Sequence, residues 1–363
     1  MSAHPSYNFA SGPARLPDAV LARAQQELLV RGADGACAAE RPFTGAAFRA
    51  TLMHARQRLA ELLALPDNYR ILFLAGGAMH QFSMVPLNLL GNSRHAAYAD
   101  SGYWSRRAMV EAARYAEVTL VAQFAGSVPL AAPPLHDWRL PVDSAYCHIT
   151  PNETVDGIAY PALPDCGSIP LVADATSCLL TAPLDVSRYG LIYAAAQKNI
   201  CIAGMTVVIV REDLLERPAP LAPTPFCYRI QAEQRSCVNT PPTIAIHLAG
   251  MVFDWIAGNG GLAAMGDLNR RKAAQLYAAI DASDGFYCAP VAVGHRSTSN
   301  VRFHLANEAL TEVFLGAAEE RGLSNLRGHS QIGGLRASLY NAMPEAGVVA
   351  LTACMADFAR RYG

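Results

Sequence analysis

Hydrophobic residues along this 363-residue chain follow two patterns that predict alternating strands and helices. Most of the short runs that are almost wholly apolar end in a polar or ionisable side chain, and amphipathic runs lie between them. The strand-like runs are 69–75, 96–100, 118–123, 145–150, 169–174, 190–197 and 205–210. Runs that are apolar on both faces and alternate with helices predict an α/β protein with a mostly parallel central sheet.

The runs that predict helices have apolar positions three or four residues apart. They are 18–29, 48–65, 79–90, 108–113, 244–256, 263–283, 309–321 and 346–361. We expect Asp18 to be the N-cap of the first helix. Three stretches rich in glycine, alanine or proline, 30–47, 124–143 and 211–243, are expected to be irregular.

The C-terminal third predicts a second, smaller unit. Strand-like runs at 300–305 and 334–338 are mixed with the last helices, which indicates an α+β domain. Glycines between positions 258 and 261 mark the boundary. We therefore expect a large domain of residues 16–258 and a small domain of residues 1–15 and 259–363.

Composition narrows the kind of protein. Apolar residues make up 52% of the chain and charged residues 16%, which allows a large core. The net charge of −1 gives no basic surplus to attract nucleic acid or a membrane, and no run approaches the roughly 20 apolar residues of a membrane span. The N-terminus has no signal-peptide pattern, the nine cysteines include no C-x-x-C pair, and the ten histidines show no metal-ligand spacing. We expect free thiols in a cytoplasmic protein without a metal site.

Two of the predicted strands end in residues that carry chemistry. Asp174 ends the run 169–174, and Lys198 follows the run 190–197. The carboxyl ends of parallel strands form the edge where α/β sheets bind ligands. A lysine and an aspartate at this edge fit pyridoxal 5′-phosphate (PLP), since the amine forms a Schiff base and the carboxylate pairs with the pyridinium nitrogen.

Three further features fit the same cofactor, and each has a simpler structural interpretation. Gly76 and Gly77 join a strand to a helix, which presents free N–H groups to a phosphate, although most such turns only reverse the chain. Trp104 follows a strand and either stacks on a flat ring or covers the end of the core. Thr154 either bonds a ring hydroxyl or caps a turn.

The chain resembles the phosphoserine aminotransferase family, which are class V PLP enzymes of fold type I. The similarity runs nearly end to end and in the family's order. It rests on 8–14, 24–28, 76–88, Asn152-Glu153-Thr154, Val172-Ala173-Asp174, Ala196-Gln197-Lys198-Asn199, 239–243 and 333–344. The resemblance implies a homodimer with composite active sites, PLP as cofactor, and amino acid and 2-oxo acid substrates.

The resemblance also implies a role for each matching residue. Lys198 would hold the cofactor and shuttle a proton, and Asp174 would keep the ring nitrogen protonated. Arg336 would clamp the substrate α-carboxylate. The other residues that the resemblance assigns to the cofactor are Gly77, Ala78, Met79, Trp104, Thr154 and Gln197, with Asn239 and Thr240 from the partner subunit.

The chain departs from the family where the substrate phosphate is held. Pro42, Phe43 and Thr44 stand where the family reads Ser-His-Arg, and Ser330 follows His329 where the family reads His-Arg. A dianion that enters a site without paired cations carries a large desolvation cost. Arg41, Arg49 and Arg327 are near in sequence and are alternatives for the missing charge.

We therefore predict a PLP-dependent aminotransferase that acts through Lys198 on a substrate other than phosphoserine, with Phe43, Thr44, His329 and Arg336 at the substrate. The alternatives are an authentic phosphoserine:2-oxoglutarate aminotransferase of serine biosynthesis, a lyase, decarboxylase or racemase on the same scaffold, and a protein without catalytic activity.

Overall fold

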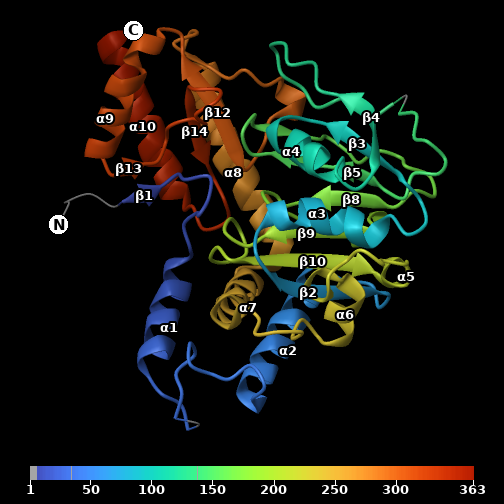
Figure 1. The fold of residues 1–363 in the computed structure, drawn as a ribbon. Coiled ribbons are helices and arrows are strands. Elements are labelled where there is room, and N and C mark those ends of the chain that lie inside the picture. The colour runs from blue at the N-terminus through green and yellow to red at the C-terminus, as the bar shows by residue number, and fades with distance from the viewer. Residues whose placement is uncertain (1–5, 34, 137) are drawn as a thin grey trace.

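A seven-stranded sheet forms the centre of the molecule in the computed structural model, which describes residues 6–33, 35–136 and 138–363 (Figure 1). In spatial order its strands are β2 (Tyr69–Ala75), β10 (Met205–Arg211), β9 (Leu191–Ala195), β8 (Leu171–Asp174), β5 (Cys147–Ile149), β3 (His95–Asp100) and β4 (Glu117–Gln123). The neighbouring strands from β9 to β4 are parallel, and β10 is antiparallel to both β2 and β9. The expectation of a mostly parallel sheet is confirmed.

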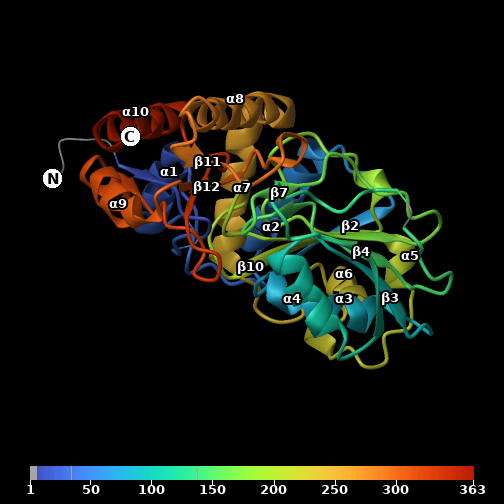
Figure 2. The same cartoon turned by 90° about the horizontal axis from the view of Figure 1, so that it is seen from above.

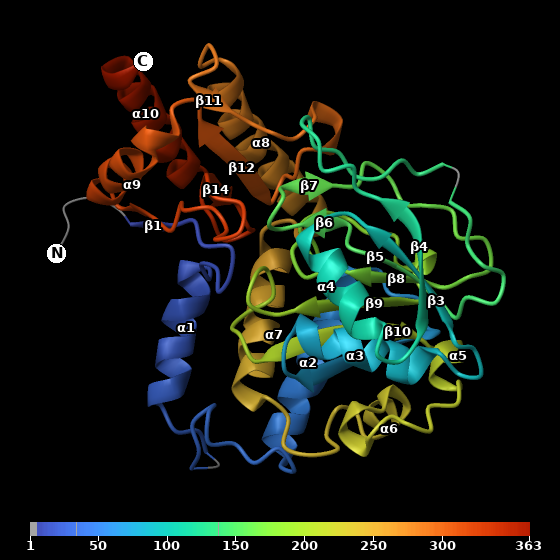
Figure 3. The same cartoon turned by 45° about the horizontal axis from the view of Figure 1, so that its top comes forward.

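Helices cover both faces of this sheet (Figure 3). One face carries α3 (Ala78–Leu89), α4 (Tyr103–Ala112), α5 (Glu212–Leu215) and α6 (Tyr228–Glu233), and the other carries α2 (Ala46–Leu62) and α7 (Thr243–Gly258), with α1 (Asp18–Leu29) beyond them. The period-two alternation along β2 explains the arrangement, because Ile71 and Phe73 join the core on the α7 face while Leu72 and Leu74 join the core on the α3 face.

A second core lies around a three-stranded antiparallel sheet (Figure 2). Its strands are β11 (Tyr287–Cys288), β12 (Asn300–Leu305) and β14 (Leu335–Ser338), and its helices are α8 (Gly261–Asp281), α9 (Thr311–Glu320) and α10 (Glu345–Tyr362). The N-terminal strand β1 (Tyr7–Asn8) pairs with β13 (Leu323–Ser324) beside this core. The remaining short strands are β6 (Asn152–Glu153) and β7 (Ile158–Ala159).

The boundary at position 258 stays a prediction, because α8 contributes to both cores. Leu262 and Met265 near its start pack in the core of the large sheet, whereas Ala273 and Leu276 pack in the second core. Helix α8 therefore packs in both cores and connects them.

Two local expectations were wrong. Pro17, not Asp18, occupies the N-cap position of α1 and makes no side-chain cap bond, and Asp18 forms an ion pair with Arg15 instead. The segment 211–243 is not wholly irregular, because it contains α5 and α6. Among the described residues, no helix combines the length and apolar character needed to cross a membrane.

Candidate active site

A pocket lies where the carboxyl ends of the parallel strands meet the first turns of α3 and α4. Its lining combines an amine, a carboxylate, amides and hydroxyls. The lining residues are Ala78, Trp104, Thr150, Asn152, Thr154, Asp174, Thr176, Ser177, Gln197 and Lys198. All of them lie at or shortly after the ends of β2, β3, β5, β8 and β9, so the parallel topology gathers them from distant parts of the sequence.

Lys198 follows β9 and is buried, and its Nζ donates a hydrogen bond to Thr154 Oγ1. The pKa of Lys198 is lowered to about 8, mainly by burial; the charge of Asp174 opposes this change and that of Arg336 contributes to it. A lowered pKa increases the fraction of neutral amine near neutral pH, and the neutral amine is the form that attacks a carbonyl. The sequence contains one other lysine, Lys272, which lies on α8 and outside the lining of this pocket.

Asp174 is the last residue of β8 and stands opposite Tyr193 in the register with β9. Its Oδ1 accepts the backbone N–H of Thr176 at 3.0 Å. Burial raises the pKa of Asp174, while the hydrogen bonds from Thr176 and the charge of Lys198 act in the opposite direction. The charged form of a buried carboxylate is stabilised most by a positively charged partner.

The turn from β2 into α3 presents backbone donors to the pocket. Gly76 has a φ of +107°, and a Cβ there would lie 2.7 Å from His80 Nδ1, so glycine is required. The N–H of Gly77 donates to the same Nδ1 at 3.1 Å. The N–H groups of Ala78 and Met79 begin a 12-residue helix and have no acceptor within it, which favours an anion at this point.

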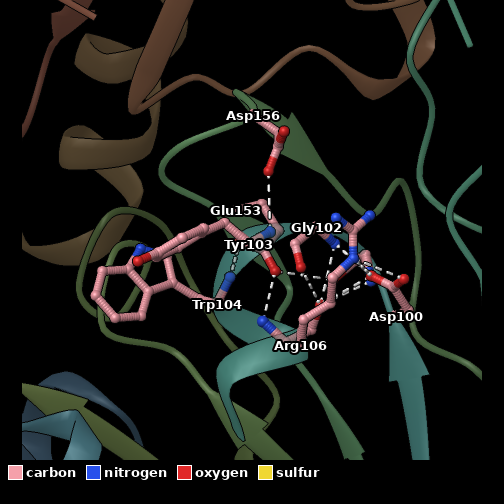
Figure 4. A network of polar contacts seen from close by, with 9 residues as sticks. Asp100, Gly102, Tyr103, Trp104, Arg106, Glu153 and Asp156 are labelled. Carbon is pink, nitrogen blue, oxygen red and sulfur yellow. Dashed lines mark hydrogen bonds and ion pairs between the residues drawn. The ribbon is translucent and has the colours of Figure 1, made fainter. Parts of the chain in front are cut away.

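Two carboxylates hold the first turn of α4 and with it Trp104 (Figure 4). Glu153 accepts the backbone N–H of Trp104 at 3.0 Å and that of Ser105 at 2.8 Å, and Asp156 accepts the N–H of Tyr103 at 3.0 Å. Burial raises the pKa of Glu153 to about 7, against the effect of the backbone donors. Sequence reasoning gave Glu153 no role of its own; its only signal was its place in a polar cluster that follows a strand.

Two buried polar atoms of the pocket lining lack a hydrogen-bond partner in the part of the chain that the structure describes. Trp104 Nε1 and Thr150 Oγ1 are buried and have no hydrogen-bond partner among the described residues. Both side chains line the pocket. Buried polar groups are nearly always hydrogen-bonded in native proteins. These orphaned atoms, the buried amine and carboxylate, and the helix N-terminus fit a flat, polar cofactor that carries a phosphate.

Arg336, which the sequence predicts to bind the substrate, lies on β14. This arginine donates to the carbonyl of Thr154 at 3.3 Å and to Ser11 Oγ at 2.7 Å, so it is held close to Lys198. Burial lowers the pKa of Arg336. The ring of His329 contacts the ring of Tyr103, with centroids 4.8 Å apart. Arg336 thus lies near Lys198, and His329 lies next to the neighbour of Trp104, although neither lines the pocket itself. Their binding of a substrate stays a prediction.

Other predicted site residues lie apart from the pocket of their own chain. Phe43 packs against the core on the α7 face, and Thr44 is exposed, with its carbonyl accepting a hydrogen bond from Arg49. Asn239 and Thr240 are exposed and do not line the pocket. Within a single chain, the structure therefore does not bring these four residues to Lys198.

The proposed substitutes for the missing phosphate ligands also lie elsewhere. Arg327 is exposed and forms an ion pair with Glu312 at 2.5 Å. Arg41 lies near enough to His247 for its charge to lower the pKa of that histidine, although burial is the larger cause. Neither arginine lines the pocket in its own chain.

The three-layer fold is that of PLP-dependent aminotransferases of fold type I. The chain belongs to the class V aminotransferase family, because residues 6–351 match the family model described as Aminotransferase class-V.

Relatives and solved structures agree with this assignment. The phosphoserine aminotransferase of Acidithiobacillus ferrooxidans is 48% identical over 361 residues and covers 98% of this chain and 99% of its own. That of Laribacter hongkongensis is also 48% identical, over 357 residues, with the same coverage. The phosphoserine aminotransferase structure from Bacillus circulans subsp. alkalophilus has a TM-score of 0.96 at 42% identity, with 99% of each chain covered. A PLP-bound phosphoserine aminotransferase from Trichomonas vaginalis has a TM-score of 0.93 at 38% identity, covering 97% of this chain and 100% of its own.

Proposed function

We propose that this aminotransferase uses PLP and that Lys198 binds the cofactor and moves the proton at the substrate Cα. The observation that carries the proposal is a buried lysine with its pKa lowered to about 8 in one pocket with the buried Asp174. When bound, the cofactor supplies an electron sink for the bond that breaks at Cα. Asp174 would hold the proton on the ring nitrogen, which maintains that sink.

The remaining lining residues would hold the cofactor. Trp104 lies on the first turn of α4, where its indole would stack on the ring, and Thr154 would bond the ring hydroxyl once its present partner Lys198 has reacted. The N–H groups of Ala78 and Met79, together with Gln197, would bind the phosphate. Gly77 leaves this approach open, because nothing lies within 4 Å of where its Cβ would be.

A homodimer would complete the site. Asn239 and Thr240 are exposed and lie outside their own pocket, as expected if they reach the cofactor phosphate of the partner subunit. The exposed loop that carries Phe43 and Thr44 would likewise face the partner's substrate. The large apolar side chains that remain exposed on α1 support a covered surface there; they are Leu21, Leu28 and Leu29.

The similarity to relatives named phosphoserine aminotransferase supports phosphoserine as the amino donor, and we propose it together with 2-oxoglutarate as the acceptor. It is the alternative to the substrate that the sequence predicted, and relatives at 48% identity over nearly the whole chain favour it. Arg336 would clamp the α-carboxylate in a bidentate pair. A second candidate, a substrate without a phosphate, is favoured by one observation: Phe43, Thr44 and Ser330 provide no positive charge.

A half-reaction tests both candidates. The purified protein should show the visible absorbance of lysine-bound PLP, and the Lys198→Ala variant should lack that band. Phosphoserine, glutamate, alanine and leucine are then added separately, without an acceptor, and loss of the band is recorded. Bleaching by phosphoserine and glutamate supports the proposed pair, whereas bleaching by an uncharged amino acid alone supports the second candidate. A lyase, decarboxylase or racemase would release product without converting the cofactor to its amine form.

A further inference from the structure

A substrate with two acidic groups needs a second cation besides Arg336. Arg336 is proposed to bind the α-carboxylate. A distal phosphate or carboxylate on the same substrate therefore needs other hydrogen-bond donors. Within the chain, Arg327 is neutralised by Glu312, and Phe43 and Thr44 provide no charge. The first turns of α3 and α4 hold a guanidinium that meets this need.

Arg107 lies between the N-terminal ends of these two helices, because its guanidinium contacts Tyr103 of α4 and Met79 of α3. One guanidinium nitrogen donates to Tyr103 Oη at 3.1 Å, and the other contacts Met79 Sδ at 3.7 Å. Each of these partners is the chain neighbour of a residue that lines the pocket, Trp104 and Ala78 respectively. Arg107 is exposed, and these two contacts hold its guanidinium beside the pocket.

The charge of Arg107 is not neutralised by a carboxylate within the described part of the chain. The two other arginines of this helical segment differ, because Arg106 pairs with Asp100 at 2.9 Å and Arg114 pairs with Glu111 at 3.1 Å. Figure 4 shows the guanidinium of Arg106 directed toward Asp100. A tyrosine hydroxyl and a thioether are weak acceptors that leave most of the five guanidinium N–H donors of Arg107 available.

Tyr103 connects Arg107 to the substrate side of the site. Its ring contacts His329, with centroids 4.8 Å apart, and the guanidinium carbon of Arg107 lies 5.9 Å from the centre of the same ring. Arg107 and His329 thus meet at one aromatic side chain, next to Trp104. The N-terminal ends of α3 and α4 add positive potential at the same place.

We propose that Arg107 binds the distal anionic group of the substrate and so determines the preference for dianionic amino acids. The ligand is a phosphate monoester, as in phosphoserine, or a side-chain carboxylate, as in glutamate. The planar guanidinium matches either group with two parallel hydrogen bonds. This inference rests on the proposed function, since it concerns the substrate of the same site.

The test compares the holoenzyme with the Arg107→Met, Arg107→Lys and Arg114→Met variants. The last is a matched control that removes one positive charge beyond the other end of α4. Dissociation constants for phosphoserine, glutamate and alanine come from bleaching titrations, and those for the unreactive dianion maleate and for acetate come from calorimetry. Arg107→Met should weaken binding of maleate and of at least one dianionic amino acid about tenfold, the worth of a charge-assisted hydrogen bond. Alanine, acetate and the control should not change, and Arg107→Lys should restore part of the loss.

Phosphoserine and glutamate distinguish which anionic group Arg107 binds. A loss confined to phosphoserine assigns Arg107 to the phosphate, and a loss confined to glutamate assigns it to the carboxylate. Equal weakening of alanine and the dianions would overturn the proposal, because Arg107 would then only support Tyr103. Loss of bound PLP with unchanged dianion preference would also overturn it. If no amino acid bleaches the wild-type protein, the proposed function fails instead.

Discussion

Asn341 donates its backbone N–H to Oδ1 of Asn199 at 3.1 Å, next to the lysine of the active site. Asn341 belongs to a turn after β14, and the turn is held by Lys272 from α8. The Nζ of Lys272 donates to the carbonyls of Leu339, Tyr340 and Met343 at 2.9 to 3.0 Å. The second buried lysine of the chain thus holds the turn that hydrogen-bonds to Asn199, the neighbour of the first.

Replacing Lys272 with methionine should therefore destabilise the protein. The apolar side chain fills similar space but leaves three buried carbonyls without their hydrogen-bond donor, so we expect the free energy of unfolding to fall by about 2–5 kcal/mol. Denaturant titration measures the change. Arg271→Met is the matched control, since Arg271 forms an exposed pair with Glu345 and its loss should cost no more than about 1 kcal/mol. Equal effects of the two variants would contradict the role of Lys272.

Glu153 should make stability depend on pH through the first turn of α4. Its pKa is raised by burial from 4.5 to about 7, so the folded state binds this proton more tightly than the unfolded state. The stabilising contribution is fully present below about pH 4.5 and is lost as the pH rises toward 7, amounting to about 3 kcal/mol at most.

The Glu153→Gln variant isolates this contribution, because glutamine does not titrate. Relative to wild type, the variant should gain stability between pH 4.5 and 7.5, as measured by unfolding at a series of pH values. Glu320→Gln, on the exposed face of α9, should follow wild type throughout. A wild-type and Glu153→Gln difference that does not vary with pH would refute the raised pKa.

The lowered pKa of Lys198 should appear in the rate at which cofactor-free protein takes up PLP. Only the neutral amine reacts, and burial lowers the pKa of Lys198 to about 8. The rate should rise with pH up to about 8 and then level off, as followed by the growth of visible absorbance. A rate that continues to rise about tenfold per pH unit to pH 10 would show an ordinary lysine.

Asp174→Asn should keep the fold and the cofactor but slow the half-reaction. The amide does not hold a proton on the ring nitrogen, so the ring withdraws electrons less well, and we expect a loss of about a hundredfold or more in single-turnover rate. Stopped-flow absorbance measures this rate with saturating amino acid. Asp185→Asn, in an exposed turn before β9, should react at the wild-type rate. A wild-type rate in Asp174→Asn would remove Asp174 from the mechanism.

Much of the fold followed from local pattern alone. The apolar runs predicted the strands of the large sheet, because strands buried on both faces are nearly continuous runs of apolar residues. Lys198 and Asp174 were recognised because Asp174 ends such a run and Lys198 follows one. The errors were at helix ends and in the segment 211–243, where short helices depend on packing more than on periodicity.

The sequence by itself determined the residue types at the strand ends, and with them the lysine, the carboxylate and the glycine turn of a PLP site. Only the tertiary structure decided which polar groups act on those residues. Glu153 has its role because it accepts hydrogen bonds from the first turn of α4. Lys272 donates to the turn beside Asn199, and Arg107 contacts the first turns of both α3 and α4. Such roles depend on contacts between residues far apart in sequence, and on the desolvation that burial imposes, neither of which a local pattern encodes.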